Sequence, residues 1–489
     1  MTSIGYARLI TQLGLSVRPL RQPAAVSRAV NRRVVAEDKV LFPVGVAIED
    51  TPLGHLEFAL RHEGVNLEVI EAAFAHIPPA SLVERLRTTP NGEPIRRACF
   101  LWEWLTGETL EVGVTPAGRY VELFPAEDYV TAATPIRAPK YRVLDNALGT
   151  ADFCPILRRD ALPTGPSLDE LLAEARHAVE AVQGADLYER AVQYLYLSET
   201  RGSFNIEREM PSADKQARFV ELLRHAGEVG TVDEDWLAGL QNVIVRDAYS
   251  REASYRVRQN WLEDATGRVT FFPPPPDDLR RAMTGWEAFV NDTTRCPDLL
   301  VKAACAAFGL VYLHPFMDGN GRLHRFMIHH ILASALGPGL LIPVSAVILK
   351  HISDYHAVLA GFSRPVTALW DYRRGDVEPS VISSPGGRPY RFFAADREMR
   401  FLHDMLVLAV REEIPNELAW LKGYDEAFAQ LDSELDLPRK DLSALIRMAQ
   451  SQGGKLSVNR RRQYAHLPEA VLDRIEAVVG RVFNPGRVA

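Results

Sequence analysis

The sequence has few cysteines, no long apolar run and no excess of positive charge. The four cysteines among its 489 residues show no CxxC spacing, so a zinc site or disulfide framework is unexpected and a reducing compartment is favoured. No stretch approaches about 20 uncharged apolar residues, so we expect no membrane span. The net charge of −7 argues against a protein that coats nucleic acid with its whole surface, although it allows one local basic face.

The N-terminus also lacks the continuous apolar segment of a secretory signal, because Arg8, Arg18 and Arg21 interrupt its apolar residues. We therefore expect a cytoplasmic protein. With 47% hydrophobic and 24% charged residues, the composition is typical of a globular chain. A length of 489 residues exceeds one ordinary core and predicts two to three domains.

Helical periodicity dominates the chain, with apolar residues at three- and four-residue intervals. It predicts an all-α fold with an N-terminal helical region over residues 1–165 and a central helical unit over residues 166–375. Residues 107–166 are irregular and rich in proline, and we interpret them as an extended connection rather than a sheet domain. Residues 395–489 form a third helical unit, with a winged helix as one arrangement, and its positive charges include Arg439, Lys440, Arg447, Lys455 and Arg460 to Arg462.

Residues 314–325 combine several groups that nucleotide chemistry requires. The turn Gly319-Asn320-Gly321 precedes a helix, and at a helix N-terminus its backbone N–H groups can converge on phosphate. Asp318 supplies a hard oxygen ligand suited to Mg²⁺. Arg322 and Arg325 lie on one helix face, where they can hold phosphates by charge-assisted hydrogen bonds.

His314 stands just before this turn, and we expect its pKa to lie near neutrality. Such an imidazole could remove a proton from an attacking hydroxyl. A base, a metal carboxylate, converging amides and two arginines suffice for phosphoryl-type transfer, which depends mostly on positioning and charge stabilisation.

The twelve residues match the HPFx(D/E)GNGRxxR signature, and in this the chain resembles the Fic family. The resemblance implies a helical core and AMPylation, the transfer of AMP from ATP to a Ser, Thr or Tyr hydroxyl of a target protein. It implies that His314 is the catalytic base and that Asp318 binds Mg²⁺, and the residues it assigns to ATP are Gly319, Asn320, Gly321, Arg322, Leu323, His324 and Arg325. Arg322 and Arg325 would grip the β- and γ-phosphates.

A second motif lies upstream, where Ser203 and Glu207 match the (S/T)xxxE(G/N) pattern of Fic proteins inhibited by an N-terminal helix. The resemblance implies that Glu207 pairs with Arg325 and blocks productive binding of the γ-phosphate. The match departs at its last position, where Arg208 replaces Gly or Asn. Taken without the family, Glu207 is equally compatible with a pair to Arg208 on a solvated helix.

The resemblance also implies a β-hairpin flap that registers the target by strand addition. The segment containing Asn260, Trp261 and Leu262 fits the flap pattern and supplies its candidate target contacts, with Leu262 also expected to line the nucleotide. Glu263 stands where Gly is common. Further downstream, the candidate adenosine contacts are Tyr355, His356 and Ser363. Ordinary packing is the alternative for the aromatic residues.

Three questions stay open at this level. With Glu207 in place, the enzyme could remove AMP from its target or act in both directions. The basic C-terminal unit could instead bind DNA, with Arg460, Arg461 and Arg462 on the phosphates. The expected partners are ATP and a target protein, the chain itself among the candidates, and a homo-oligomer is compatible with the sequence.

Overall fold

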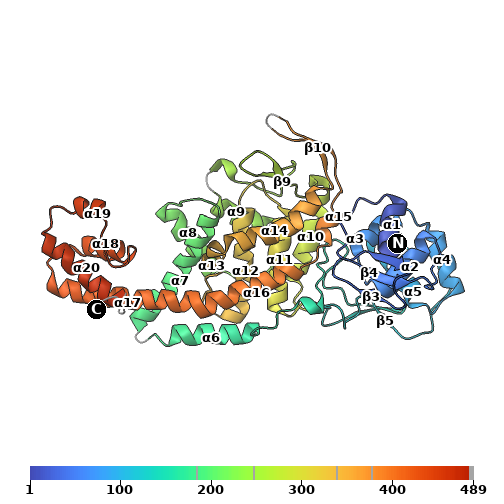
Figure 1. Ribbon diagram of the computed structural model, residues 1–489, viewed down its shortest axis with the longest axis horizontal. Coiled ribbons are helices and arrows are strands. Elements are labelled where there is room, and N and C mark those ends of the chain that lie inside the picture. The colour runs from blue at the N-terminus through green and yellow to red at the C-terminus, as the bar shows by residue number, and fades with distance from the viewer. Residues whose placement is uncertain (183–184, 229, 246–247, 338–339, 376–377, 484–489) are drawn as a thin grey trace.

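The computed structural model describes residues 1–182, 185–228, 230–245, 248–337, 340–375 and 378–483. Figure 1 shows an elongated molecule with an N-terminal module at one end, a helical core in the middle and a small helical unit at the other end. Helix dominates throughout, as the periodicity predicts, and the strands form only small sheets. No helix among the described residues is both long and apolar enough to cross a membrane.

The N-terminal module has its own apolar core and is not purely helical. Its helices are α1 (Gly5–Leu13), α2 (Pro52–His62), α3 (Leu67–Phe74), α4 (Pro79–Thr88) and α5 (Glu93–Thr106). They pack with a sheet of order β1-β2-β4-β3, formed by Thr2–Ser3, Ala24–Ser27, Val40–Pro43 and Val34–Val35. The expectation of a helical region therefore misses this sheet, whose strands of two to four residues are too short to show a periodicity.

The proline-rich connection also forms a small sheet, which corrects the expectation that it lacks one. Strands β5 (Val121–Glu122) and β6 (Ile136–Ala138) flank β7 (Val143–Asp145), with β5 parallel and β6 antiparallel to it. Non-helical backbone must still satisfy its N–H and C=O groups, and this pairing does so. A short 3-10 helix, η1 (Arg159–Ala161), ends the connection.

The core surrounds one buried helix, α11 (Leu299–Leu313), in which every residue from Leu300 onward is buried. A helix that is apolar all round must be enclosed by protein, and here the remaining core helices supply that cover. They are α10 (Pro276–Asn291), α12 (Asn320–Leu336), α13 (Val344–Lys350), α14 (Ile352–Thr367), α15 (Arg388–Arg391) and α16 (Asp396–Leu408). Arg391 of α15 binds Glu71 of the N-terminal module at 2.6 Å, which fastens the module to the core.

Four helices precede this core in sequence: α6 (Leu168–Glu180), α7 (Ala185–Ile206), α8 (Ala213–Arg224) and α9 (Glu234–Ile244). A short 3-10 helix, η2 (Ala248–Ser250), follows α9. Helix α7 packs on α13 so closely that a Cβ added at Gly202 would lie 2.6 Å from the backbone nitrogen of Ala346. Glu199, one turn earlier, accepts a hydrogen bond of 2.7 Å from the backbone N–H of Ser345. The position of α7 on the core is therefore fixed at two successive turns.

The far end of the molecule is purely helical in the residues described. A π-helical turn, η3 (Ala409–Glu413), leads into α17 (Ile414–Glu434), which carries α18 (Arg439–Gln450), α19 (Val458–Gln463) and α20 (Glu469–Phe483). Since the described residues from 414 to 483 contain no strand, the wing of a winged helix is not formed. Helix α16 belongs to the central core, and the separate core of this unit begins at Tyr424.

Candidate active site

The signature loop joins the end of α11 to the start of α12. His314 caps α11 in the left-handed region with φ of 51°, and Gly319 precedes α12 with φ of 89°. These two turns reverse the chain between consecutive core helices, so that the histidine and the N-terminus of α12 lie at one place. Gly319 is needed there because left-handed backbone disfavours a Cβ.

The His314 imidazole is buried and has a defined orientation. Its Nδ1 lies 3.1 Å from the carbonyl oxygen of Val311, so Nδ1 carries the hydrogen and Nε2 keeps its lone pair. Burial, with a smaller contribution from the positive charge of Arg256, lowers the pKa of His314 to about 4. The expected near-neutral pKa is therefore wrong, and the imidazole is the neutral base over the whole physiological range.

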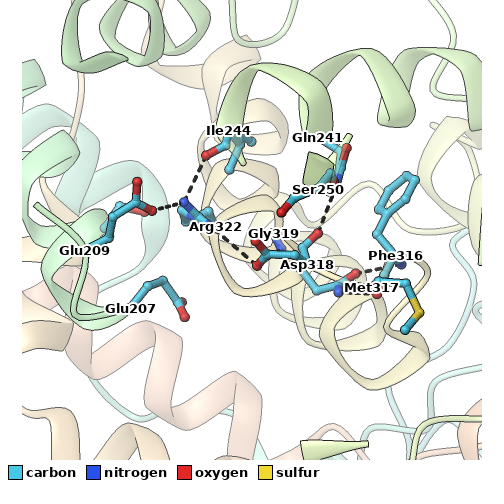
Figure 2. Close-up of polar contacts among 12 residues, drawn as sticks. Glu207, Glu209, Gln241, Ile244, Ser250, Phe316, Met317, Asp318, Gly319 and Arg322 are labelled. Carbon is cyan, nitrogen blue, oxygen red and sulfur yellow. Dashed lines mark hydrogen bonds and ion pairs between the residues drawn. The ribbon is translucent and has the colours of Figure 1, made fainter. Parts of the chain in front are cut away.

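Side chains from the segment before the flap hold the loop backbone. Arg256 donates through Nε to the His314 carbonyl at 2.9 Å, and Asn260 donates to the Phe316 carbonyl at 3.2 Å. Glu252 accepts from the Met317 N–H at 2.6 Å, and Gln241 donates to the Asp318 carbonyl at 3.3 Å. Figure 2 shows the Gln241 contact beside the loop. Each loop group thus has a partner distant in sequence, and the roles of Glu252 and Gln241 carry no motif signal.

Glu207 pairs with Arg325 as the second motif implies. The Arg325 Nη2 lies 2.8 Å from Glu207 Oε1, and the arginine side chain is only 1% exposed. Ser203 accepts twice from the same guanidinium, through Oγ at 3.1 Å and through its carbonyl at 2.8 Å. Desolvation opposes ionisation of Glu207, but the charges of Arg325 and Arg322 outweigh it and lower the pKa of Glu207, so the pair is ionic.

The Glu207 carboxylate lies directly on the glycine turn. A Cβ added at Gly321 would stand 2.3 Å from Glu207 Oε1, so only glycine permits this approach. The first turn of a helix favours an anion because its N–H groups are unpaired and its dipole is positive there. Arg325 Nη1 is buried without a hydrogen-bond partner in the described structure. The N-terminus of α12 is therefore a candidate anion site, and the Glu207 carboxylate lies against it.

Arg322 occupies a second charged contact that the motif does not indicate. Its Nη1 binds Glu209 and the Ile244 carbonyl, the latter at 2.9 Å, and Nη2 lies 3.4 Å from Asp318 Oδ1 (Figure 2). Glu209 lies two residues beyond Glu207, and sequence reasoning missed it because no pattern covers that position. The same short segment therefore places one carboxylate on each signature arginine.

Comparison with known proteins agrees with this geometry. The Fic/DOC family model matches residues 231–332, a span that contains the loop and α12. Residues 231–332 are thus similar to the Fic/DOC family. A protein named protein adenylyltransferase Fic from Nematostella vectensis is 30% identical over 139 residues, which cover 27% of this chain and 30% of the relative. The Drosophila melanogaster protein of that name is 39% identical over 74 residues, covering 14% of this chain and 15% of the relative. The chain thus spans less than a third of these curated relatives.

Two solved structures show weaker likeness. A Fic domain containing signaling protein from Bacteroides thetaiotaomicron is 17% identical with a TM-score of 0.38, covering 52% of this chain and 97% of that one. A Fic family protein from Desulfovibrio desulfuricans is 18% identical with a TM-score of 0.37, covering 64% of this chain and 88% of that one.

The segment expected to form the flap is a two-stranded antiparallel hairpin, β8 (Leu262–Glu263) and β9 (Val269–Phe271). Leu262 is 43% exposed and lies in register with Phe271. The indole of Trp261 donates to Glu263 at 2.7 Å, so the residue at the usual glycine position anchors the flap's own tryptophan. Asn260 is buried under the loop and does not face a target, which corrects its assignment as a target contact.

Several residues expected at the nucleotide have side chains that are buried in the core. Leu323 and His324 are fully buried, and the His324 ring packs 4.6 Å from Phe308 between core helices. Tyr355 is buried, and its ring centroid lies 5.9 Å from that of His324, so its ring packs in the core. Adjacent positions on a helix point in different directions, and His356 is exposed while Ser363 is half-buried. These last two remain predicted adenosine contacts.

Asp318 is suited to Mg²⁺ by its chemistry and exposure. Its side chain is 47% exposed, and Oδ1 accepts the Gly319 N–H at 2.6 Å. No group of three or more metal-binding side chains occurs in the part of the chain that the structure describes. Mg²⁺ often takes one or two carboxylates and completes its shell with water and substrate phosphates. A single accessible aspartate beside an anion site fits that habit.

Proposed function

We propose that this protein transfers AMP from ATP to a hydroxyl group of a target protein. The observation that carries the proposal is the convergence of a neutral His314, the anion site at the N-terminus of α12 and the accessible Asp318 carboxylate. The names of the curated relatives support the same activity.

The chemistry follows from these positions. Nε2 of His314 removes the proton of the target hydroxyl, and the oxygen attacks the α-phosphorus of ATP. The bond from that phosphorus to the bridging oxygen breaks, and pyrophosphate leaves with the electron pair. Asp318 would hold Mg²⁺, which neutralises phosphate charge. The amides of Asn320 and Gly321 and the guanidinium of Arg325 would hold the phosphates in line.

We further propose that Glu207 inhibits this reaction by occupying the phosphate position. Its carboxylate lies on Gly321 and neutralises Arg325, so a γ-phosphate would meet a negative charge and lose its cation. If this closed arrangement is favoured by about 3 kcal/mol, fewer than about 1% of molecules are competent. Glu207→Gly should then raise the rate by up to about 100-fold.

Labelling with ATP that carries a radioactive α-phosphate tests both proposals. The wild-type chain should label itself or lysate proteins weakly, Glu207→Gly strongly, and Glu207→Gly/His314→Ala not at all. Equal labelling by all three chains would refute the mechanism. Release of AMP from a pre-labelled target by the wild-type chain, with loss of release in Glu207→Gly, would instead favour the removal reaction.

The alternative of DNA binding finds less support in the C-terminal unit. Arg461, the middle arginine of α19, is paired at once with Glu469, Asp473 and Glu476 at 2.6 to 2.7 Å. Its charge is therefore not available to phosphates. Arg460 and Arg462 remain exposed, and a gel-shift titration at two salt concentrations would test them.

A further inference from the structure

Arg322 is the meeting point of three parts of the molecule. Its guanidinium reaches Glu209 after α7, the last carbonyl of α9 at Ile244, and Asp318 in the signature loop (Figure 2). Its side chain is only 4% exposed, and it also stacks 5.5 Å above the buried ring of Phe204. Arg322 therefore has a defined position before any nucleotide binds.

Glu209 is the only carboxylate other than Asp318 that the structure pairs with Arg322 among the described residues. It also binds Lys215 of α8 at 2.5 Å, and the Glu209 and Lys215 side chains are 14% and 8% exposed. Lys215 lies 5.2 Å from the Phe204 ring that Arg322 also covers. The carboxylate is thus held between two cations on one aromatic surface, which is a fixed arrangement.

The Glu209 contact differs from the Glu207 contact in what it occupies. The Glu207 side chain is 35% exposed, and its carboxylate lies on Gly321 at the candidate anion site. Glu209 is more deeply buried and lies on the opposite side of Arg322 from Asp318, as Figure 2 shows. Glu209 and the Ile244 carbonyl both hold Nη1 of Arg322, and this leaves Nη2 directed at Asp318.

We propose that Glu209 is a positioning residue: it fixes the Arg322 side chain, and Arg322 in turn orients the Asp318 carboxylate. On this view Arg322 orients the carboxylate that takes Mg²⁺ and is not itself a phosphate ligand, in contrast to the role that the motif implies for it. Side chains that orient a metal ligand in this way influence metal affinity strongly. The inference rests on the proposed function, because it assigns Asp318 to the metal of the nucleotide.

Nucleotide binding measured by calorimetry tests the inference without requiring catalysis. The probe is an ATP analogue with a methylene group between the α- and β-phosphorus, titrated into Glu207→Gly in EDTA and then at increasing Mg²⁺. Adding Glu209→Gln should raise the half-saturating Mg²⁺ concentration about tenfold. Affinity for the analogue in EDTA should stay within about twofold, since no phosphate contact is lost.

Two further variants separate this role from a general loss of structure. Glu209→Gln/Lys215→Met removes one charge of each sign and carries the same expectation if Glu209→Gln alone does not fold. Glu413→Gln removes another buried carboxylate, the partner of Lys350, outside the loop and should leave the Mg²⁺ requirement unchanged.

Tighter binding of the analogue in EDTA by Glu209→Gln would overturn the inference, because it would make Glu209 a second inhibitory partner that withholds Arg322 from phosphate. An unchanged Mg²⁺ requirement would also overturn it. Failure of the proposed function has a different signature: Glu207→Gly would bind the Mg²⁺-bound analogue yet transfer no AMP from ATP. In that case the result for Glu209 still stands.

Discussion

The two sides of the signature loop differ in burial and in charge pairing. On the α7 side, Arg325 and Arg322 are buried and each is already paired with a carboxylate of the same short segment. On the flap side, Leu262 is exposed, and Trp261 donates to Glu263 within the hairpin. Under the proposed function, the arginines expected at the phosphates are already paired, whereas the expected target surface is open. Control of the rate and recognition of the target can therefore change separately.

The largest expected effect is on the pH dependence of the labelling rate, which is set by His314 in the signature loop. The base is active when neutral, and its pKa of about 4 means that its neutral fraction falls only as the pH drops through that value. At pH 5 about 90% of His314 is neutral, against about 3% for an ordinary histidine, a difference of about thirtyfold. Initial labelling rates of Glu207→Gly between pH 4.5 and 8 measure this. A half-maximal rate near pH 6.5 would show that the imidazole is not desolvated.

Gly202→Ala would disturb the packing of α7 on α13, which positions Glu207 beside the loop. The added Cβ would meet the α13 backbone at Ser345 and Ala346, both 2.6 Å away, and backbone cannot give way as a side chain can. Overpacking of this kind costs about 1–3 kcal/mol and should move α7, so that basal labelling rises as stability falls. Denaturant unfolding and labelling of the same preparation check both.

Gly239→Ala in α9 is the matched control, since nothing lies within 4 Å of its Cβ. It should gain up to about 1 kcal/mol of stability with unchanged labelling. Similar behaviour of the two alanine variants would contradict the packing argument.

A smaller effect is expected at Arg208, where this chain departs from the family's Gly or Asn. Arg208 has φ of 55°, in the left-handed region, so the motif position demands a conformation that arginine adopts at a cost. Arg208→Asn should raise the free energy of unfolding by about 1 kcal/mol. Arg208→Ala removes the charge and keeps the strained backbone. If it stabilises as much as Arg208→Asn, the charge and not the backbone is responsible.

The smallest effect on stability is expected on the flap side. Because Leu262 is 43% exposed, Leu262→Ala should change the free energy of unfolding by less than about 0.5 kcal/mol. Labelling of a target by Glu207→Gly/Leu262→Ala should nevertheless fall several-fold if the flap registers that target. Binding of nucleotide, measured in the same variant, should not change. A parallel loss of both would place Leu262 at the nucleotide rather than at the target.

Local patterns predicted the parts of the site that are contiguous in sequence. The helix that ends next to Glu207, the hairpin after Asn260 and the loop from His314 to Arg325 each lie within a few consecutive turns. Their order along the chain was enough to place them, and the Glu207–Arg325 contact followed from family resemblance.

The parts that were missed depend on contacts between distant segments. Glu252 meets Met317 across 65 residues and Glu209 meets Arg322 across 113, and no spacing rule links such pairs. The low pKa of His314 arises from burial, which is a property of the assembled core. The burial of the Leu323 and His324 side chains was also missed, because a motif names consecutive residues, whereas a helix turns each of them toward a different neighbour.

The attachment of α7 has a consequence for how Glu207 is aimed. Along its length, Arg190 binds Asp425 at 2.6 Å, Tyr194 stacks on Trp420 at 4.9 Å and Ser198 donates to Glu417 at 2.8 Å, all on α17. Glu207 thus lies at the end of a helix that is fixed at several successive turns to the helix bearing the C-terminal unit. Substitutions that never approach ATP could therefore retune the enzyme by tilting α7, and surface positions on α17 become places to adjust its basal rate.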